Sequence, residues 1–178
     1  GGATGEFNVD GGIVNVTGTG GNALRIGRDA GGTGAMTITG DQATINVTGF
    51  TVGGNIGAPS DAQGTLTFVS SAGGVSPILA SEDVTLNDGT TTAGVGDLLV
   101  ELTTNAPPAG PVLLIDVGGT LSGTFRNLAE GDLVANSGGR RITYMFGDGN
   151  DIALIPEPAT ALLLVGGLLA GLATRRRR

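Results

Sequence analysis

The chain has 178 residues, of which 35 are Gly; it contains no Cys and no His, and all nine of its basic residues are Arg. This composition excludes Ser-His-Asp and Cys-His triads, Cys/His zinc sites, P-loops and lysine Schiff bases, so we expect no enzyme activity, metal or cofactor. Without its last four residues, the chain carries five Arg against 16 acidic residues, and this net charge of −11 argues against a nucleic-acid partner.

The first 81 residues contain a degenerate repeat of roughly 26 to 31 residues. The matched segments are Val14–Gly18 with Ile45–Gly49, Leu24–Gly27 with Phe50–Gly53, and Gly34–Ile38 with Gly64–Phe68. The three matches follow the same order along the chain, which chance does not readily produce. They indicate an internally repeated body.

Within each segment, aliphatic and polar side chains alternate. Val14 and Val16 alternate with Asn15 and Thr17, which is the period of a strand with one buried face. Glycine pairs between the segments supply the positive φ that tight corners need. Short strands repeated in this way favour an all-β fold, a right-handed parallel β-helix in which each coil buries its aliphatic side chains against the next. An antiparallel sandwich built from the same strands is the alternative.

Beyond Glu82 the repeat fades, but four further strands are predicted. They are Asp97–Leu102, Val112–Val117, Arg141–Phe146 and Asp151–Ile155, the last two joined by the turn sequence Gly147-Asp148-Gly149-Asn150. Because an uncapped stack exposes strand edges, we expect this stretch to close the end of the solenoid. The predicted domains are therefore 1–81 for the Gly-rich β-helix repeats, 82–155 for the end of the solenoid and its capping strands, and 156–178 for a separate C-terminal segment.

The C-terminal segment differs sharply in composition from the rest of the chain. Pro156, Glu157 and Pro158 precede an uncharged stretch, Ala159 to Thr174, and the chain ends in Arg175, Arg176, Arg177 and Arg178. The uncharged stretch is apolar on every side and about 24 Å long as a helix, somewhat short of the roughly 30 Å hydrocarbon core. Because Arg side chains snorkel and a bilayer thins locally, we expect a single transmembrane α-helix with a cytoplasmic Arg cluster. A buried helix with a solvated Arg tail is the alternative.

This three-part arrangement resembles the PEP-CTERM sorting signal, a tail that is also called an ice-binding protein C-terminal domain. The resemblance covers positions 156–178, with Ile155 where Val is common before the motif. It implies that an exosortase, a membrane-embedded cysteine transpeptidase, recognises the Pro-Glu-Pro motif and removes the tail. The apolar stretch would be the membrane span and the Arg cluster the cytoplasmic stop. The precursor would be a single-pass inner-membrane protein, made with a signal peptide ahead of Gly1 and sorted to the cell surface or beyond.

The Gly-rich body resembles the β-helical passenger repeats of autotransporters. The likeness is carried by Leu24–Gly27, Gly64–Phe68 and Gly147–Asp151. The last of these segments also fits part of a calcium-binding nonapeptide, but Phe146 occupies the first Gly position and the pattern occurs once. We therefore expect a hairpin turn there and no metal site.

Three other patterns point to alternative functions. Arginine and carboxylate groups on a β-helix face are typical of polysaccharide lyases, and flat rows of Thr can order ice-like water. Two Asn-x-Thr sequences match the glycosylation pattern, although strand composition explains them equally well. The residues concerned are Arg25, Arg28 and Asp29 for polysaccharide chemistry, Thr37, Thr39, Thr65 and Thr67 for ice binding, and Asn15 and Asn46 for glycosylation.

These features together predict a non-catalytic exported protein of the cell envelope or extracellular matrix. Its β-helical body would be structural or adhesive, and it would be anchored and then processed by an exosortase. The expected partners are the exosortase, the inner membrane, and exopolysaccharide or other cell-surface components. A polysaccharide-active β-helix enzyme and an ice- or surface-binding module are the alternatives.

Overall fold

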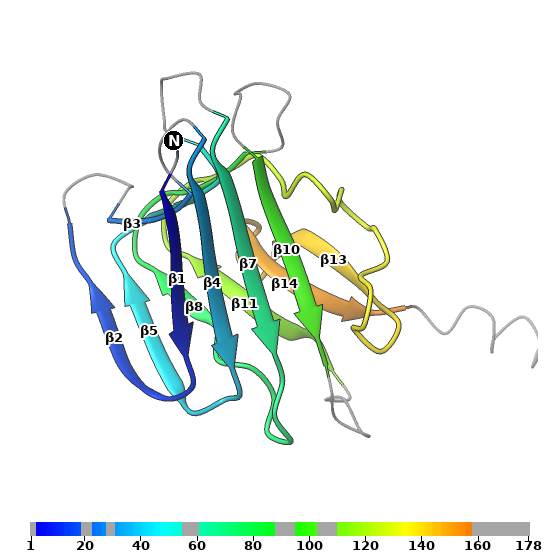
Figure 1. Ribbon diagram of the computed structural model, residues 1–178. Coiled ribbons are helices and arrows are strands. Elements are labelled where there is room, and N and C mark those ends of the chain that lie inside the picture. The colour runs from blue at the N-terminus through cyan, green and yellow to red at the C-terminus, as the bar shows by residue number, and fades with distance from the viewer. Residues whose placement is uncertain are drawn as a thin grey trace, which may run out of the picture.

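The computed structural model describes residues 3–18, 23–27, 31–54, 61–87, 95–102 and 110–157. These ranges contain 14 strands and no helix (Figure 1). The all-β class predicted from the alternating pattern is therefore confirmed. The predicted membrane span, Ala159 to Thr174, lies outside the described residues.

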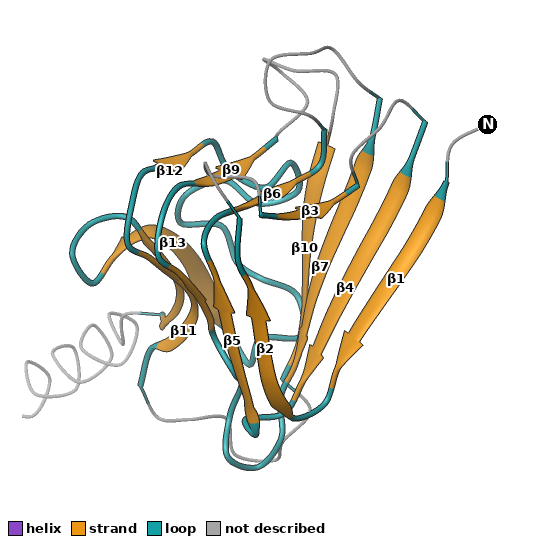
Figure 2. Ribbon diagram, turned by 90° about the vertical axis from the view of Figure 1, so that its left-hand side faces the viewer, coloured by secondary structure: helices purple, strands orange, loops and turns teal. Residues whose placement is uncertain are grey.

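Twelve of the strands form three sets of parallel neighbours, which Figure 2 shows as a wall of long strands and two adjoining sheets. The wall consists of β1 (Thr4–Val9), β4 (Thr33–Thr39), β7 (Gln63–Val69) and β10 (Val95–Glu101). The second set is β2 (Gly12–Val16), β5 (Ala43–Val47), β8 (Ile78–Ala80) and β11 (Val112–Val117). The third is β3 (Leu24–Ile26), β6 (Phe50–Val52), β9 (Val84–Leu86) and β12 (Leu121–Ser122).

The chain visits the three sheets in turn, so each strand pairs with the strand three places further along. Three consecutive strands therefore make one coil, and the described residues contain four such coils. Mostly parallel pairing of this kind is compatible with the predicted β-helix. It does not fit the alternative of an antiparallel sandwich.

The repeats found in the sequence are stacked neighbours in the structure. Val14 pairs with Ile45, and Leu24 pairs with Phe50. In the wall of long strands, Gly34 pairs with Gly64, and the following aliphatic positions stay in register. The three unequal offsets thus each correspond to one coil, because the connections between sheets differ in length while the strand pairing does not.

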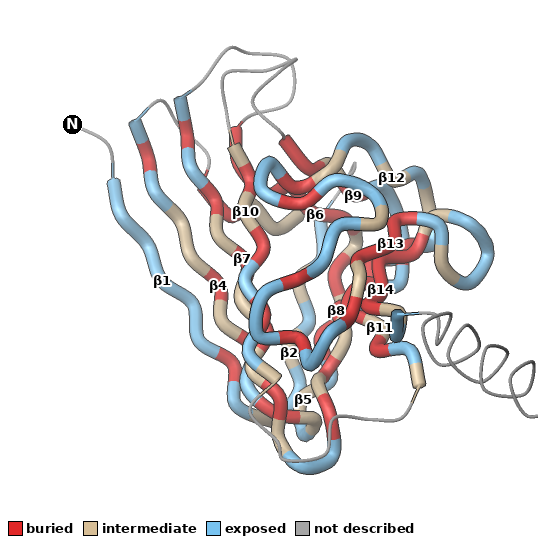
Figure 3. The backbone as a smooth tube through the Cα atoms, turned by 90° about the vertical axis from the view of Figure 1, so that its right-hand side faces the viewer, coloured by how far each residue is buried: buried red, intermediate tan, exposed pale blue. Residues whose placement is uncertain are grey.

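The core lies between the three sheets and is built from the inward-pointing side chains of successive coils. Met36, Ile38, Leu66 and Phe68 point inward from β4 and β7, and Phe50 points inward from β6; all five are buried. Burying a side chain of this size contributes about 1.5–3 kcal/mol. Figure 3 shows buried and less buried segments alternating along β4 and β7.

The first coil is less well covered than the others. Phe7 of β1 pairs with the buried Met36 but is itself 40% exposed, and Ile13 of β2 is 73% exposed. In Figure 3, β1 is exposed over most of its length, whereas β7 and β10 are not. The body is therefore packed more tightly toward its C-terminal coils.

A row of glycines lines the corner where the end of each third-sheet strand meets the wall of long strands. Gly34, Gly64 and Gly96 lie in one register row, which begins at Gly5 of β1. At Gly64, an added Cβ would lie 2.2 Å from the carbonyl oxygen of Ile26. At Gly34, Gly64 and Gly96, unlike at Gly5, backbone from another coil passes directly over the position, so no side chain fits there.

The last two strands form a hairpin that reverses the direction of the sheet. β13 (Arg140–Phe146) and β14 (Asp151–Pro156) pair antiparallel, joined by the turn 147–150, and β14 pairs antiparallel with β11. The strands predicted over 97–102, 112–117, 141–146 and 151–155 are thus all present, as β10, β11, β13 and β14. The boundaries proposed at 81/82 and 155/156 stay predictions.

The segment between β12 and β13 covers the free edge of β10. The Arg126 N–H donates to the carbonyl oxygen of Gly96 at 2.8 Å. The Asn127 side chain accepts from the Leu98 N–H at 3.1 Å and donates to the Leu98 carbonyl at 2.8 Å, as a neighbouring strand would. This segment and the hairpin, residues 123–157, are called the cap below.

Candidate functional site

The candidate site lies at the end of β14, the last strand among the described residues. Pro156 is the last residue of β14, and it pairs with Arg140 of β13. Because Pro has no N–H to donate, it suits the final position of a strand, and the ladder stops there. Both Pro156 and the next residue, Glu157, are exposed. The first two residues of the Pro-Glu-Pro motif therefore emerge directly from the cap, without a linker.

An ion pair fixes the side chain of Glu157. The Arg141 Nη2 atom donates to Glu157 Oε1 at 2.8 Å, and the two side chains are 42% and 48% exposed. The other terminal nitrogen, Nη1, donates to the Gly131 carbonyl oxygen at 2.8 Å. The guanidinium thus bridges a turn of the cap and the acidic residue of the motif.

The cap is also held by three hydrogen bonds to Tyr144, of which two are buried and one is partly buried. The Tyr144 hydroxyl donates to the Leu128 carbonyl at 2.7 Å and accepts from the Phe125 N–H at 3.1 Å. Glu130 accepts from the Tyr144 N–H at 2.7 Å. Since Tyr144 and Phe125 are both buried, these bonds tie β13 to the segment that covers β10.

The turn of the hairpin is fastened to the end of β11. Asp151 Oδ1 accepts from the Val117 N–H at 2.9 Å, and Asn150 Nδ2 donates to the Val117 carbonyl at 2.9 Å. Burial raises the pKa of the Asp151 carboxyl; the Val117 N–H opposes this rise, and the charges of Asp116 and Asp148 add to it. The buried Asp151 carboxylate thus attaches the hairpin to the end of β11, although removing its charge from water is unfavourable.

Replacing Asp151 by Asn is expected to change the pH dependence of stability. The raised pKa means that folded Asp151 binds its proton more tightly than unfolded Asp151, so this residue lowers stability as the pH rises above the ordinary Asp pKa of about 3.9. The Asn variant keeps an acceptor for the Val117 N–H, but it cannot ionise, so it lacks this decrease in stability with rising pH. The free energy of unfolding of the variant, measured with urea, should therefore rise relative to that of the wild type as the pH increases from about 4 to 7. If the exposed control Asp10→Asn changes the pH dependence of the free energy of unfolding as much as Asp151→Asn does, the effect does not come from the buried Asp151 carboxyl.

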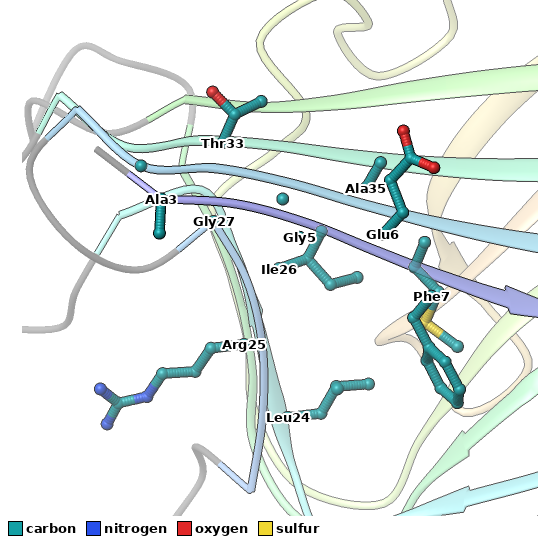
Figure 4. Close-up of a pocket in the computed structure, with 13 residues that line it drawn as sticks. Ala3, Gly5, Glu6, Phe7, Leu24, Arg25, Ile26, Gly27, Thr33 and Ala35 are labelled. Carbon is teal, nitrogen blue, oxygen red and sulfur yellow. The ribbon is translucent and has the colours of Figure 1, made fainter. Parts of the chain in front are cut away.

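The sequence that resembles a calcium nonapeptide forms the turn of the hairpin, as predicted. Among the described residues, no group of three or more acidic side chains is placed to hold a metal ion. The pocket nearest the predicted polysaccharide residues, about 310 Å³, is lined by β1, β3 and β4 of the first two coils. Figure 4 shows Arg25 and Glu6 pointing away from each other there. The other two residues of that pattern, Arg28 and Asp29, lie outside the described part of the chain.

Two of the four candidate ice-binding Thr residues share a register position. Thr37 pairs with Thr67, but Thr39 pairs with Val69, and Ala35 pairs with Thr65. The register between β4 and β7, which is that of the matched segments Gly34–Ile38 and Gly64–Phe68, therefore pairs one Thr of each strand, and ice binding stays an alternative prediction.

The two Asn-x-Thr sequences stack as a ladder. Asn46 Nδ2 donates to Asn15 Oδ1 at 2.8 Å, and the two residues occupy the same register position on β2 and β5. The ladder links neighbouring coils on the outer face of the second sheet. This agrees with the interpretation of these sequences as strand composition.

The remainder of the predicted sorting signal lies outside the described residues. This concerns Pro158, the span Ala159 to Thr174, and Arg175 to Arg178. The ranges that are described contain no helix of sufficient length and hydropathy to be a candidate membrane span.

Sequence reasoning missed Arg141 as a partner of the motif. Part of the signal was present, because a regular hairpin with Phe146 opposite Asp151 would place Arg141 opposite Pro156; the register shift between Thr143 and Phe146 places it opposite Ile155, next to the motif. Long-range side-chain contacts of this kind follow from the register of a hairpin. The predicted last strand ended at Ile155, so the motif was not included in the predicted pairing.

Comparison with known proteins identifies one segment of the chain. No curated protein and no solved structure matches the chain. Residues 154–178, which include the end of β14 and Glu157, match the family model described as the PEP-CTERM protein-sorting motif. The chain thus carries a PEP-CTERM protein-sorting motif, and this motif supports an exported protein that passes the membrane and is processed by an exosortase.

Proposed function

We propose that this chain is a non-catalytic, structural or adhesive protein of the cell surface or extracellular matrix, with a right-handed β-helical body. The observation that carries the proposal is the sorting motif at 154–178, which continues directly from the last strand of the folded cap. In this proposal the body is the delivered product. The segment from Ala159 to Arg178 is a temporary anchor that spans the inner membrane once, with the Arg cluster in the cytoplasm.

The body has features that suit such a role. It is acidic, and its outer faces carry Thr and Asn side chains that form hydrogen bonds between coils, as Asn46 does with Asn15. The chain contains no His and no Cys, so it offers no base or thiol for the triads that use them. Polar ladders on a rigid stack support binding to hydrated partners such as exopolysaccharide, which we propose as the class of matrix component.

Within this function, each part of the motif has a physical task. Pro156 ends the strand ladder, and Glu157 presents an exposed carboxylate directly after the last strand. The uncharged stretch holds the motif at the membrane, where the exosortase supplies the attacking thiolate. The chain itself supplies recognition and placement.

The exchange Glu157→Gln is expected to slow tail removal by about tenfold or more, because hydrogen bonds to a charged group contribute about 1.5–3 kcal/mol. The measurement is the mass of the full chain, in membrane and released fractions, from cells that contain or lack an exosortase. Exosortase should shorten the wild-type chain, while Glu157→Gln should stay full-length in the membrane fraction.

Two controls accompany this experiment. Glu82→Gln removes an exposed acidic residue far along the chain from the motif and should be processed like the wild type. Deleting residues 159–178 should release the body without any processing. Unchanged membrane fractionation of the deletion, or equal processing of Glu157→Gln and the wild type, would contradict the proposal.

A further inference from the structure

The acidic residue of the sorting motif already has a partner within the folded body. Glu157 accepts a hydrogen bond from Arg141 at 2.8 Å, in an ion pair on the surface of the cap. The motif residue before it, Pro156, is paired with Arg140 at the end of the hairpin. Two of the three motif residues are therefore attached to β13.

Arg141 is held rigidly enough to act as a fixed anchor. Its Nη1 atom donates to the Gly131 carbonyl, and its backbone forms a bridge with Leu133. On the next residue, the Ile142 N–H donates to the Asp132 carbonyl at 3.0 Å, and the Ile142 carbonyl accepts from the Gly131 N–H at 3.0 Å. The turn 129–133 thus fixes the direction in which the Arg141 guanidinium points.

We propose that Arg141 is a positioning residue for the sorting reaction: it holds Glu157 against the cap, so the exosortase must compete with the body for the motif. The inference rests on the proposed function. The Glu157 carboxylate cannot be enclosed by an enzyme while it remains on Arg141, and Pro156 cannot be enclosed while it remains in the hairpin. Tail removal therefore follows separation of the end of β14 from β13.

The Arg141–Glu157 ion pair is weak enough for the exosortase to displace it. An exposed ion pair is weak and is screened by salt, so the end of β14 opens readily and the effect on the rate is limited to about fivefold. Deeper in the cap, the buried Asp151 and Tyr144 keep the rest of the hairpin in place. Opening is thus confined to the residues that the enzyme needs.

The test compares Arg141→Gln with Arg126→Gln in the full chain, using the initial rate of exosortase-dependent tail removal. Arg126 also forms an exposed pair, with Nε donating to Asp97 at 3.0 Å, so this control removes the same charge and the same kind of contact away from the motif. Arg141→Gln should be processed faster, by up to about fivefold, through a lower KM with kcat unchanged. Arg141→Lys should return the rate toward that of the wild type.

Two further measurements separate positioning from a general loosening of the cap. Added salt should accelerate the wild type and leave Arg141→Gln nearly unchanged. Hydrogen exchange of a peptide covering residues 151–157 should be faster in Arg141→Gln at its C-terminal amides, whether or not the enzyme is present. A rate for Arg141→Gln that is equal to or below that of the wild type, or an equal acceleration by Arg126→Gln, would overturn the inference. A wild-type chain that keeps its tail in the presence of exosortase would instead overturn the proposed function.

Discussion

Replacing Gly64 by Ala is expected to lower the free energy of unfolding by about 3 kcal/mol or more, or to prevent folding. An added Cβ would lie 2.2 Å from the Ile26 carbonyl oxygen and 2.5 Å from the Gly53 nitrogen. These two atoms are themselves joined by a hydrogen bond, because the Gly53 N–H donates to the Ile26 carbonyl at 2.8 Å. The methyl group would therefore have to separate two coils or break the bond between them.

The same register row supplies the control for this substitution. Gly5 occupies the equivalent position on β1, but nothing lies within 4 Å of a Cβ added there. Gly5→Ala should therefore change the free energy of unfolding by no more than about 0.5 kcal/mol. Urea unfolding followed by circular dichroism would measure both variants. Similar stabilities for the two would contradict the close approach at Gly64.

Replacing Tyr144 by Phe is the second substitution with a large expected effect, a loss of about 2–3 kcal/mol in the free energy of unfolding. The hydroxyl accepts from the Phe125 N–H and donates to the Leu128 carbonyl, and both partners belong to buried residues. Its removal leaves a buried donor and a buried acceptor without their shared partner, while the ring packing is retained. The exposed neighbour gives the control, because Met145→Leu should be close to neutral.

The same residue gives an optical readout. Tyr144 is the one Tyr of the chain, which has no Trp, so phenolate absorbance reports it alone. Burial raises the pKa of the Tyr144 hydroxyl, so at pH values below the unfolded pKa of about 10 the ionisation of this group does not change the stability. As the pH rises further, the unfolded phenol ionises first and stability is lost. The phenolate band should therefore appear together with the loss of β-sheet signal. A phenolate band in the folded protein would contradict the buried placement.

Much of the fold could be predicted because the residues that match in the sequence repeat are the same residues that pair between neighbouring coils. Segments such as Val14–Gly18 and Ile45–Gly49 resemble each other because they stack on each other, and inward positions such as Ile45 and Val47 must then stay aliphatic. The role of Gly64 was less accessible. From the sequence, glycines read as turn residues, whereas Gly64 lies inside a strand, and its constraint comes from backbone of an earlier coil, at Ile26.

The candidate site divides in the same way. Pro156 and Glu157 were predicted, because their order before an apolar stretch and an Arg cluster is a local pattern. The contact of Arg141 with Glu157 depends on the hairpin register, and a register shift between Thr143 and Phe146 alters the count of facing residues. Local composition does not encode such a shift, so the pairing became visible in the folded cap.

The reversed direction of β14 has a consequence for how such a body can vary in height. A strand that runs antiparallel to β11 cannot serve as the template for another parallel coil, so additional coils must be inserted upstream of the hairpin. A taller or shorter stack would then leave the hairpin, the turn at Gly131 and the end of β14 at Pro156 unchanged. Under the proposed function, the part that the sorting enzyme would recognise is thereby geometrically independent of the height of the body.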